Sequence, residues 1–189
     1  MPSTTVDANP LNQGLVQQKS SQPCVIVIFG ASGDLTKRKL VPSLFHLRKQ
    51  GLLPHNLAVI GISRSQFSDE EFRDRVKPDD VDSEWDRFRE GLFYMPGSYS
   101  DPECYQQLQA KLTELQRERE LPPNIIYYLA VSPEAFPVVV SQLGEHNMNR
   151  TEGWVRVIFE KPFGTDLESA EELNRAIHET FDESQVYRI

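Results

Sequence analysis

The sequence predicts an α/β fold built on a doubly wound, mostly parallel sheet. Three observations predict it. Short runs rich in β-branched residues alternate about five times with helical patterns. The first run, residues 25–29, is apolar at every position, which is typical of a strand buried on both faces of a sheet. Helix-start signals follow most of these runs.

The first helix is expected between Gly33 and Gly51, because apolar residues recur there at positions i, i+4 and i+7. Gly51 should end it, since glycine readily adopts the left-handed conformation that follows many helices. A second buried strand is expected over residues 57–62. The residues expected to share one apolar face of the helix are Leu40, Leu44 and Leu47.

The rest of the chain repeats this alternation. A weaker strand is expected over 92–95, stronger ones over 125–130 and 155–159, and a last one from Val186. A long charged helix should end near Glu120. Capping boxes, or N-caps followed by proline, mark four helix starts. They are Ser68 with Glu71, Asp101 with Pro102, Ser132 with Pro133, and Thr165 with Glu168. The last helix should bury Leu167, Ala170, Leu173 and Ile177.

Length and composition fit one globular domain. The chain has 189 residues, of which 39% are hydrophobic and 25% charged. Residues 1–22, rich in Ser, Gln, Asn and Pro, are expected to be a mobile tail, and residues 23–189 the domain. The net charge of −8 disfavours nucleic acid and anionic membranes as partners. No apolar run is long enough to span a bilayer.

The cysteines and the N-terminus indicate the cellular compartment of the protein. Cys24 and Cys104 are spaced as neither a zinc site nor a disulfide framework. The N-terminus lacks the basic and apolar segments of a secretory signal. We therefore expect a cytoplasmic protein with two reduced thiols, a redox switch being the alternative.

A glycine-containing turn follows the first strand. Gly30 allows a tight turn, and Gly33 lets the backbone approach a pyrophosphate closely. The helix that follows offers free amides and a positive dipole end to the same anion, and Ser32 can donate a further hydrogen bond. The spacing is Gly-x-x-Gly and not the full Gly-x-Gly-x-x-Gly, so a plain turn is the alternative. The flanking strand and helix favour nucleotide binding.

The end of the second strand favours NADP over NAD. NAD-binding domains usually carry a carboxylate there, which accepts a hydrogen bond from the ribose. This strand ends instead with Arg64 between Ser63 and Ser65. A guanidinium suits a 2′-phosphate, and Lys39 could add positive charge. A solvated surface arginine is the alternative.

Two further strand ends carry candidate residues. Ala130 and Val131 are small enough to let a flat ring lie against the backbone, although a plain turn explains them equally well. Lys161 could hold a phosphate, a hydroxyl or a ribose, or be a solvated charge, and Pro162 could form a cis bond or a hinge. The four histidines lack partners at metal-ligand spacing, so neither a metal site nor a catalytic histidine is expected.

Five segments, in order, resemble the glucose-6-phosphate dehydrogenase family. They cover nearly everything after Cys24 and are together highly specific. The tail and the phrase at residues 49–54 are similar to the bacterial or cyanobacterial branch. The segments are GASGDLTKRKL at 30–40, GISRS at 61–65, YLAVSP at 128–133, EKPFG at 160–164 and YRI at 187–189.

The resemblance implies a Rossmann-type NADP-binding domain and the family's reaction. The family oxidises glucose 6-phosphate at C1 to 6-phosphoglucono-lactone and passes hydride to NADP, the entry step of the oxidative pentose phosphate pathway. It does so as homo-dimers or tetramers. By resemblance, Lys161 touches both coenzyme and sugar, and Pro162 adjusts its placement.

The resemblance also implies a set of coenzyme contacts. Arg64 and Lys39 would recognise the 2′-phosphate. Further contacts would come from Ser98 and Tyr99 near the coenzyme, and from Ala130 and Val131 beside the nicotinamide. The residues implied to wrap the pyrophosphate are Gly30, Ala31, Ser32, Gly33, Asp34, Leu35, Thr36 and Lys37.

By the same resemblance, the catalytic base lies beyond Ile189. In the family, Tyr-Arg-Ile is followed by Asp-His-Tyr-Leu-Gly-Lys, which binds the sugar phosphate, and the histidine base stands in a large β+α domain. That domain is absent here, so this chain is expected to bind glucose 6-phosphate weakly or not at all, and to be inactive alone. The alternatives are a non-catalytic NADP-binding module and another NADP-dependent oxidoreductase on the same fold.

Overall fold

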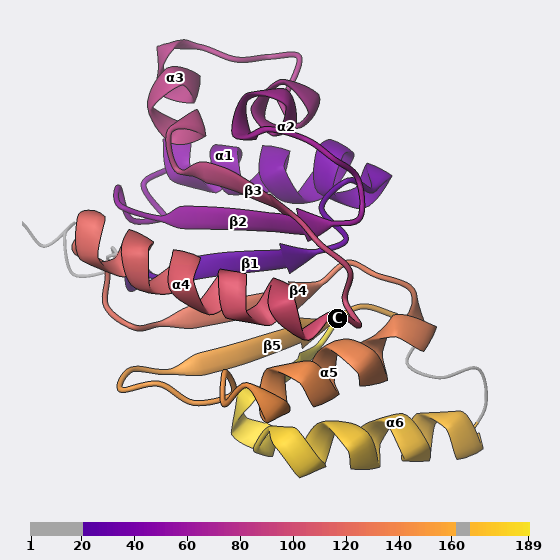
Figure 1. Cartoon of the computed structure of the whole chain (residues 1–189). Helices are drawn as coiled ribbons and strands as arrows, with labels where there is room; N and C mark the ends of the chain where they lie inside the picture. Colours follow the sequence, from indigo (N-terminus) through magenta and orange to yellow (C-terminus); the bar gives the residue numbers. More distant parts are fainter. Residues whose placement is uncertain (1–20, 162–166) are drawn as a thin grey trace, which may run out of the picture.

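The structure, a computed structural model, describes residues 21–161 and 167–189. The expected tail and the expected roles of Pro162 and Thr165 lie outside the described residues, apart from Ser21 and Gln22. The described chain holds one sheet of six strands in the order β3-β2-β1-β4-β5-β6 (Figure 1). The strands are β1 (Val25–Phe29), β2 (Ala58–Ser63), β3 (Leu92–Pro96), β4 (Ile125–Leu129), β5 (Val155–Phe159) and β6 (Val186–Arg188).

Every neighbouring pair of strands is parallel, so the sheet is fully and not only mostly parallel. The chain enters at the centre in β1, winds outward to β3, returns to β4 beside β1, and winds outward again to β6. This is the doubly wound α/β order that the alternating pattern predicted, and the prediction of fold class is confirmed. All six strands point the same way, which brings their carboxyl ends to one edge (Figure 1).

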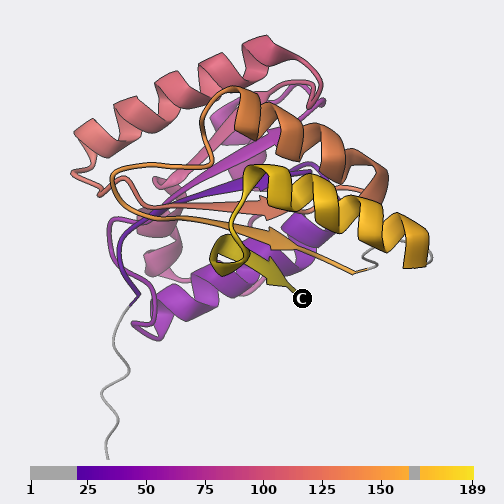
Figure 2. The same cartoon turned by 90° about the horizontal axis from the view of Figure 1, so that it is seen from below.

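Helices cover both faces of the sheet. One face packs against α4, α5 and α6, and the other against α1, α2 and α3 (Figure 2). The helices are α1 (Val41–Lys49), α2 (Asp69–Arg75), α3 (Ser83–Arg89), α4 (Pro102–Glu118), α5 (Phe136–Glu145) and α6 (Leu167–Thr180). Short helical turns are η2 (Thr36–Leu40), η3 (Pro133–Ala135) and η4 (Glu183–Gln185).

Strand β1 shows why the apolar run was informative. All five of its residues are buried. Val25, Val27 and Phe29 face α4–α6, whereas Ile26 and Ile28 face α1. Successive side chains of a strand point to opposite faces, so only an unbroken apolar run can fill both layers.

The expected apolar face of the first helix is confirmed in part, since Leu40 and Leu44 pack against the core on the α1 side of the sheet. Val41 and Phe45 are the buried residues of α1, whereas Leu40, Leu44 and Leu47 are only partly buried. The physical reason is the π-helical turn η2, which runs directly into α1. A π turn carries more residues than an α turn and so rotates the following side chains. Gly51 does follow the helix end, with a φ of +71°.

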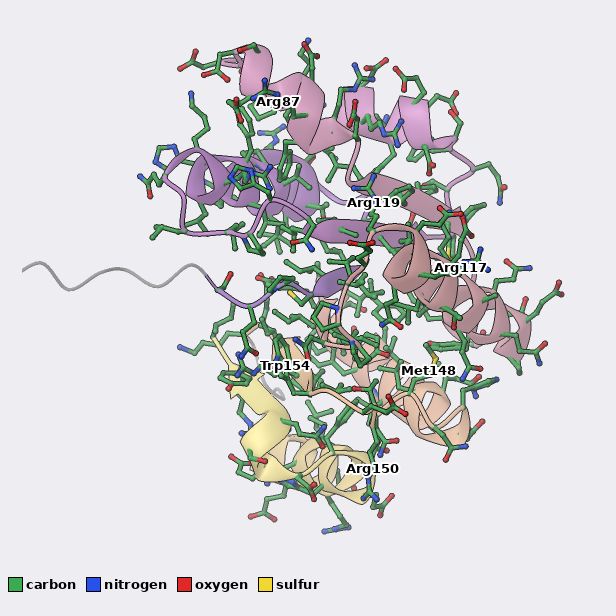
Figure 3. The ribbon with its side chains drawn as sticks, turned by 90° about the vertical axis from the view of Figure 1, so that its left-hand side faces the viewer. Arg87, Arg117, Arg119, Met148, Arg150 and Trp154 are labelled. Carbon is green, nitrogen blue, oxygen red and sulfur yellow. The ribbon has the colours of Figure 1, made fainter. Side chains whose placement is uncertain are left out.

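The described chain has an apolar cavity of about 640 Å³ on the α1 side of the sheet. Helices cover β1 to β3 on this side but not β5 and β6 (Figure 2). Trp154 stands at the amino end of the sheet, where its indole N–H donates to Gln22 at 2.7 Å (Figure 3). Other residues that line the cavity are Ile26, Leu40, Leu44, Ile126, Tyr128 and Ile158. Among the described helices, none is long and apolar enough to cross a bilayer.

Candidate functional site

A cleft of about 570 Å³ lies at the carboxyl edge of the sheet. The turns that follow β1, β2, β3 and β4 form its walls, which is where ligands bind in open α/β sheets. It brings together eight of the residues expected from the sequence. They are Gly30, Ser32, Gly33, Arg64, Ser98, Tyr99, Ala130 and Val131.

Gly30 joins three strands at the floor of the cleft. Its φ is +91°, a conformation that favours glycine. A Cβ atom at this position would stand 2.1 Å from the main-chain oxygen of Ala130. The amides of Gly30 and Ala31 donate to the carbonyl oxygen of Ile62 in β2, at 2.9 and 3.1 Å. The backbone of the turn is therefore fixed against β2 and β4, and Gly33 closes it by donating to the oxygen of Gly30 at 3.0 Å.

The other residues of the turn after β1 fall into a buried group and a group that is exposed or partly buried. Ala31 and Thr36 are buried, and their side chains serve packing under the turn. Asp34, Lys37 and Lys39 are exposed beside the cleft but do not line it. Leu35 is partly buried and also outside the cleft lining. These residues can contribute main-chain amides or positive charge to an anion in the turn. Their side chains do not form the walls of the cleft.

Arg64 offers a free cation at the cleft. Its side chain is exposed, and among the described residues it makes no hydrogen bond or ion pair. The two flanking serines, by contrast, form hydrogen bonds within the protein. Oγ of Ser63 and the carbonyl oxygen of Ser65 both bond to the hydroxyl of Tyr94. An arginine whose neighbours are held and whose own donors are unused is suited to bind an anion from solution.

Tyr99 stands next to this cation. Its ring meets Phe29 edge-on at 6.0 Å, and its carbonyl oxygen accepts from the hydroxyl of Tyr105 at 2.8 Å. Burial raises the pKa of the Tyr99 hydroxyl, and the main chain of Gly30 and the charge of Arg64 only partly oppose that rise. Tyr99 is thus a neutral hydrogen-bond donor at physiological pH.

Sequence reasoning missed five cleft residues. They lie one turn beyond the strand ends, so they depend on where the next helix begins. Glu134 is the charged one, and its pKa is lowered by hydrogen bonds from its own main-chain N–H and from Ser132. The one feature of the sequence that could have indicated these residues is their position after β3 and β4. The five are Ser100, Ser132, Glu134, Ala135 and Val138.

Lys161 lies outside the cleft. It is exposed at the end of β5, and its main-chain N–H donates to the oxygen of Ile189 at 3.1 Å. The preceding carboxylate, Glu160, accepts a hydrogen bond from the hydroxyl of Tyr128. All four histidines are described, and none of them lines the cleft.

The parallel sheet, the glycine turn and the cleft at its carboxyl edge define a dinucleotide-binding domain of the Rossmann type. Residues 27–189 match the family model described as "Glucose-6-phosphate dehydrogenase, NAD binding domain". The chain belongs to the glucose-6-phosphate dehydrogenase family. The resemblance found in the sequence is confirmed, and a different oxidoreductase family is excluded.

Individual relatives agree. Glucose-6-phosphate 1-dehydrogenase of Bacillus subtilis is 41% identical over 174 residues, which cover 90% of this chain and 36% of that protein. Glucose-6-phosphate 1-dehydrogenase 6, cytoplasmic, of Arabidopsis thaliana is 40% identical and covers 87% and 34%. A solved glucose-6-phosphate dehydrogenase, in complex with its substrate glucose-6-phosphate, superposes with a TM-score of 0.81 at 38% identity, covering 90% and 37%. The chain thus spans just over a third of the length of these relatives.

Proposed function

We propose that this chain binds NADP in the cleft and is the coenzyme-binding part of an enzyme that oxidises glucose 6-phosphate. The observation that carries the choice of NADP is the guanidinium of Arg64 at the end of β2, which has no partner among the described residues and stands where NAD-binding domains carry a carboxylate. A 2′-phosphate would satisfy this cation through two charge-assisted hydrogen bonds.

The rest of the coenzyme follows from the walls of the cleft. The pyrophosphate would lie on the turn from Gly30 to Gly33, where a side chain on Gly30 would collide with Ala130. The exposed charge of Lys39 would assist Arg64 at the 2′-phosphate. The nicotinamide would lie against Ala130 and Val131 across the cleft. This assignment uses main-chain donors and small side chains, which suit a flat, anionic ligand.

Bound NADP would supply the hydride acceptor for oxidation at C1 of the sugar. The named relatives support the substrate, since one solved relative holds glucose-6-phosphate. Lys161 would contact the sugar and the coenzyme from the end of β5. The product would be 6-phosphoglucono-lactone, placing the reaction in the oxidative pentose phosphate pathway. We propose that the whole protein is cytoplasmic, as the name of the Arabidopsis relative states for that protein, and forms homo-dimers or tetramers.

Calorimetric titration with NADP and with NAD tests the coenzyme proposal. The wild-type chain should prefer NADP, and Arg64→Ala should weaken NADP binding roughly 10- to 100-fold, since hydrogen bonds to charged groups contribute about 1.5–3 kcal/mol. Arg38→Ala is the matched control, because Arg38 is also exposed near the turn but is paired with Asp34 at 3.7 Å. No preference for NADP in the folded wild type, or no effect of Arg64→Ala, would refute the proposal.

A further inference from the structure

We propose that Tyr94 is a positioning residue for coenzyme selection. Its hydroxyl closes a partly buried ring of hydrogen bonds around the turn that carries Arg64, and so fixes the main chain from which the guanidinium reaches the 2′-phosphate. The inference rests on the proposed function, since it assumes that Arg64 binds that phosphate. It adds a residue on β3 that does not line the cleft.

The ring consists of three hydrogen bonds. The amide of Ser65 donates to Oγ of Ser63 at 3.3 Å, and Oη of Tyr94 donates to the carbonyl oxygen of Ser65 at 2.7 Å. The third contact joins Oγ of Ser63 and Oη of Tyr94 at 2.6 Å. Because Tyr94 has only one hydroxyl proton, Ser63 is the donor in that contact. The donors and acceptors therefore follow one direction around a closed ring. Arg64 lies between Ser63 and Ser65, the two serines that this ring joins.

Two of the three residues that form this ring are buried. Ser63 is 2% exposed and Tyr94 7% exposed. The aromatic rings of Phe67 and Phe72 pack on Tyr94, with centroids 5.4 and 5.1 Å away. Hydrogen bonds that are shielded from water polarise one another, and breaking one leaves a buried polar group unpaired.

Tyr94 is itself held from two sides. Its residue pairs with Gly61 across the β2–β3 ladder. Its main-chain N–H donates to Oδ1 of Asp69, the first residue of α2, at 2.6 Å. The carbonyl oxygen of Ser63 accepts from Gly97 at 2.9 Å. The hydroxyl of Tyr94 thus connects the end of β2 to a framework that already joins β3 and α2.

The consequence concerns Arg64, whose side chain is free while its main chain is fixed on both sides. An arginine on a loose turn would lose more conformational freedom on binding a phosphate than one on a fixed turn. Removal of the Tyr94 hydroxyl should therefore weaken the binding of the ligand that carries the 2′-phosphate, and leave NAD binding unchanged.

The test extends the titrations to Tyr94→Phe, alone and combined with Arg64→Ala. Tyr94→Phe should weaken NADP binding about five- to tenfold, the equivalent of one buried hydrogen bond, and change NAD binding by less than about twofold. In the Arg64→Ala background, Tyr94→Phe should cause no further loss of NADP affinity. That non-additivity shows that Tyr94 acts through Arg64.

Tyr127→Phe is the matched control. The Tyr127 hydroxyl is also buried and donates to a main-chain oxygen, that of Met148, at 3.0 Å. Met148 lies on the side of the molecule that Figure 3 faces, away from the cleft. Tyr127→Phe should lower stability by a similar amount and leave the ratio of NADP to NAD affinity unchanged. A merely structural role of Tyr94 would give the same result as this control.

The outcomes separate the two proposals. If Arg64→Ala abolishes the NADP preference and Tyr94→Phe keeps it, the positioning role is wrong and the proposed function stands. If the folded wild type does not bind NADP, or Arg64→Ala has no effect, both are wrong. Amide hydrogen exchange of the coenzyme-free protein gives a second readout: exchange at Ser65 should accelerate in Tyr94→Phe but not in Tyr127→Phe, and unchanged exchange would also overturn the inference.

Discussion

At the scale of single residues, the backbone of the cleft depends on Gly30. Gly30 and Gly51 both have positive φ angles, of +91° and +71°, but only Gly30 has a neighbour in the space that a side chain would take. The sequence alone predicted a turn at Gly30 from its place after an apolar strand. It could not predict the contact with Ala130, because that contact is made between strands about 100 residues apart.

Gly30→Ala should destabilise the fold by about 3 kcal/mol or more, because backbone strain and a steric clash add together. Gly51→Ala should cost only about 1–2 kcal/mol, since nothing lies within 4 Å of the added Cβ atom and strain acts alone. Urea unfolding of both variants measures the difference. Equal losses of stability at the two sites would contradict the described geometry of the turn.

The two thiols predict a pH dependence. Burial raises the pKa of both Cys24 and Cys104 from 9.0 to about 11. Between pH 9 and 11 the unfolded thiols lose their protons while the folded ones keep them, so the free energy of unfolding falls as the pH rises through that window. Denaturant titrations at stepped pH should show this fall. It should be smaller in the Cys24→Ala, Cys104→Ala double variant, and an unchanged slope there would count against the raised pKa values.

At the scale of elements, strong local signals predicted the helix starts and weak ones failed. Ser68 caps α2 and forms the full capping box with Glu71, and Asp101 caps α4, as expected. Helix α3, which the sequence analysis did not predict, has only seven residues, too few to show an apolar period. The two buried residues of α1, Val41 and Phe45, were missed because a π turn is not visible in a pattern counted at helical spacing.

Two serines at helix starts offer a direct comparison. Ser68→Ala should lower the free energy of unfolding by about 1 kcal/mol, because the amide of Glu71 would lose its side-chain acceptor. Ser132→Ala should change it by less than about 0.5 kcal/mol, since the Ser132 side chain makes no capping bond to η3. Thermal or denaturant unfolding compares the two. An equal effect would show that the caps were assigned wrongly.

At the scale of the whole molecule, the apolar cavity on the α1 side and the cleft at the carboxyl edge of the sheet differ in chemistry. The cavity on the α1 side is lined mainly by apolar side chains such as Leu44, Ile126 and Trp154. The cleft is lined by two glycines, several hydroxyls and the free Arg64. A dinucleotide needs donors for its phosphates, and for that reason we propose the cleft as the coenzyme site. This choice was predictable from the sequence, because ligands of doubly wound sheets bind at the carboxyl ends of strands.

The 189-residue chain should bind NADP but reduce it slowly. None of its four histidines lines the cleft, and a general base typically contributes about 10²–10⁴-fold to the rate. With saturating NADP and glucose 6-phosphate, NADPH absorbance should grow at least about 100-fold more slowly than with the Bacillus subtilis protein. A rate equal to that of the relative would show that the described residues include the base.

We propose that the coenzyme occupies the cleft after β1 and β2, with its 2′-phosphate on Arg64. The most direct measurement is a map of backbone amide chemical shifts of this 21.7 kDa chain with and without NADP. The largest changes should occur at Gly30, Ser32, Gly33 and Ser98, and Arg64 should show a change with NADP that NAD does not reproduce. Changes centred on Ile126 and Trp154 in the apolar cavity, or identical maps for NADP and NAD, would contradict this proposal.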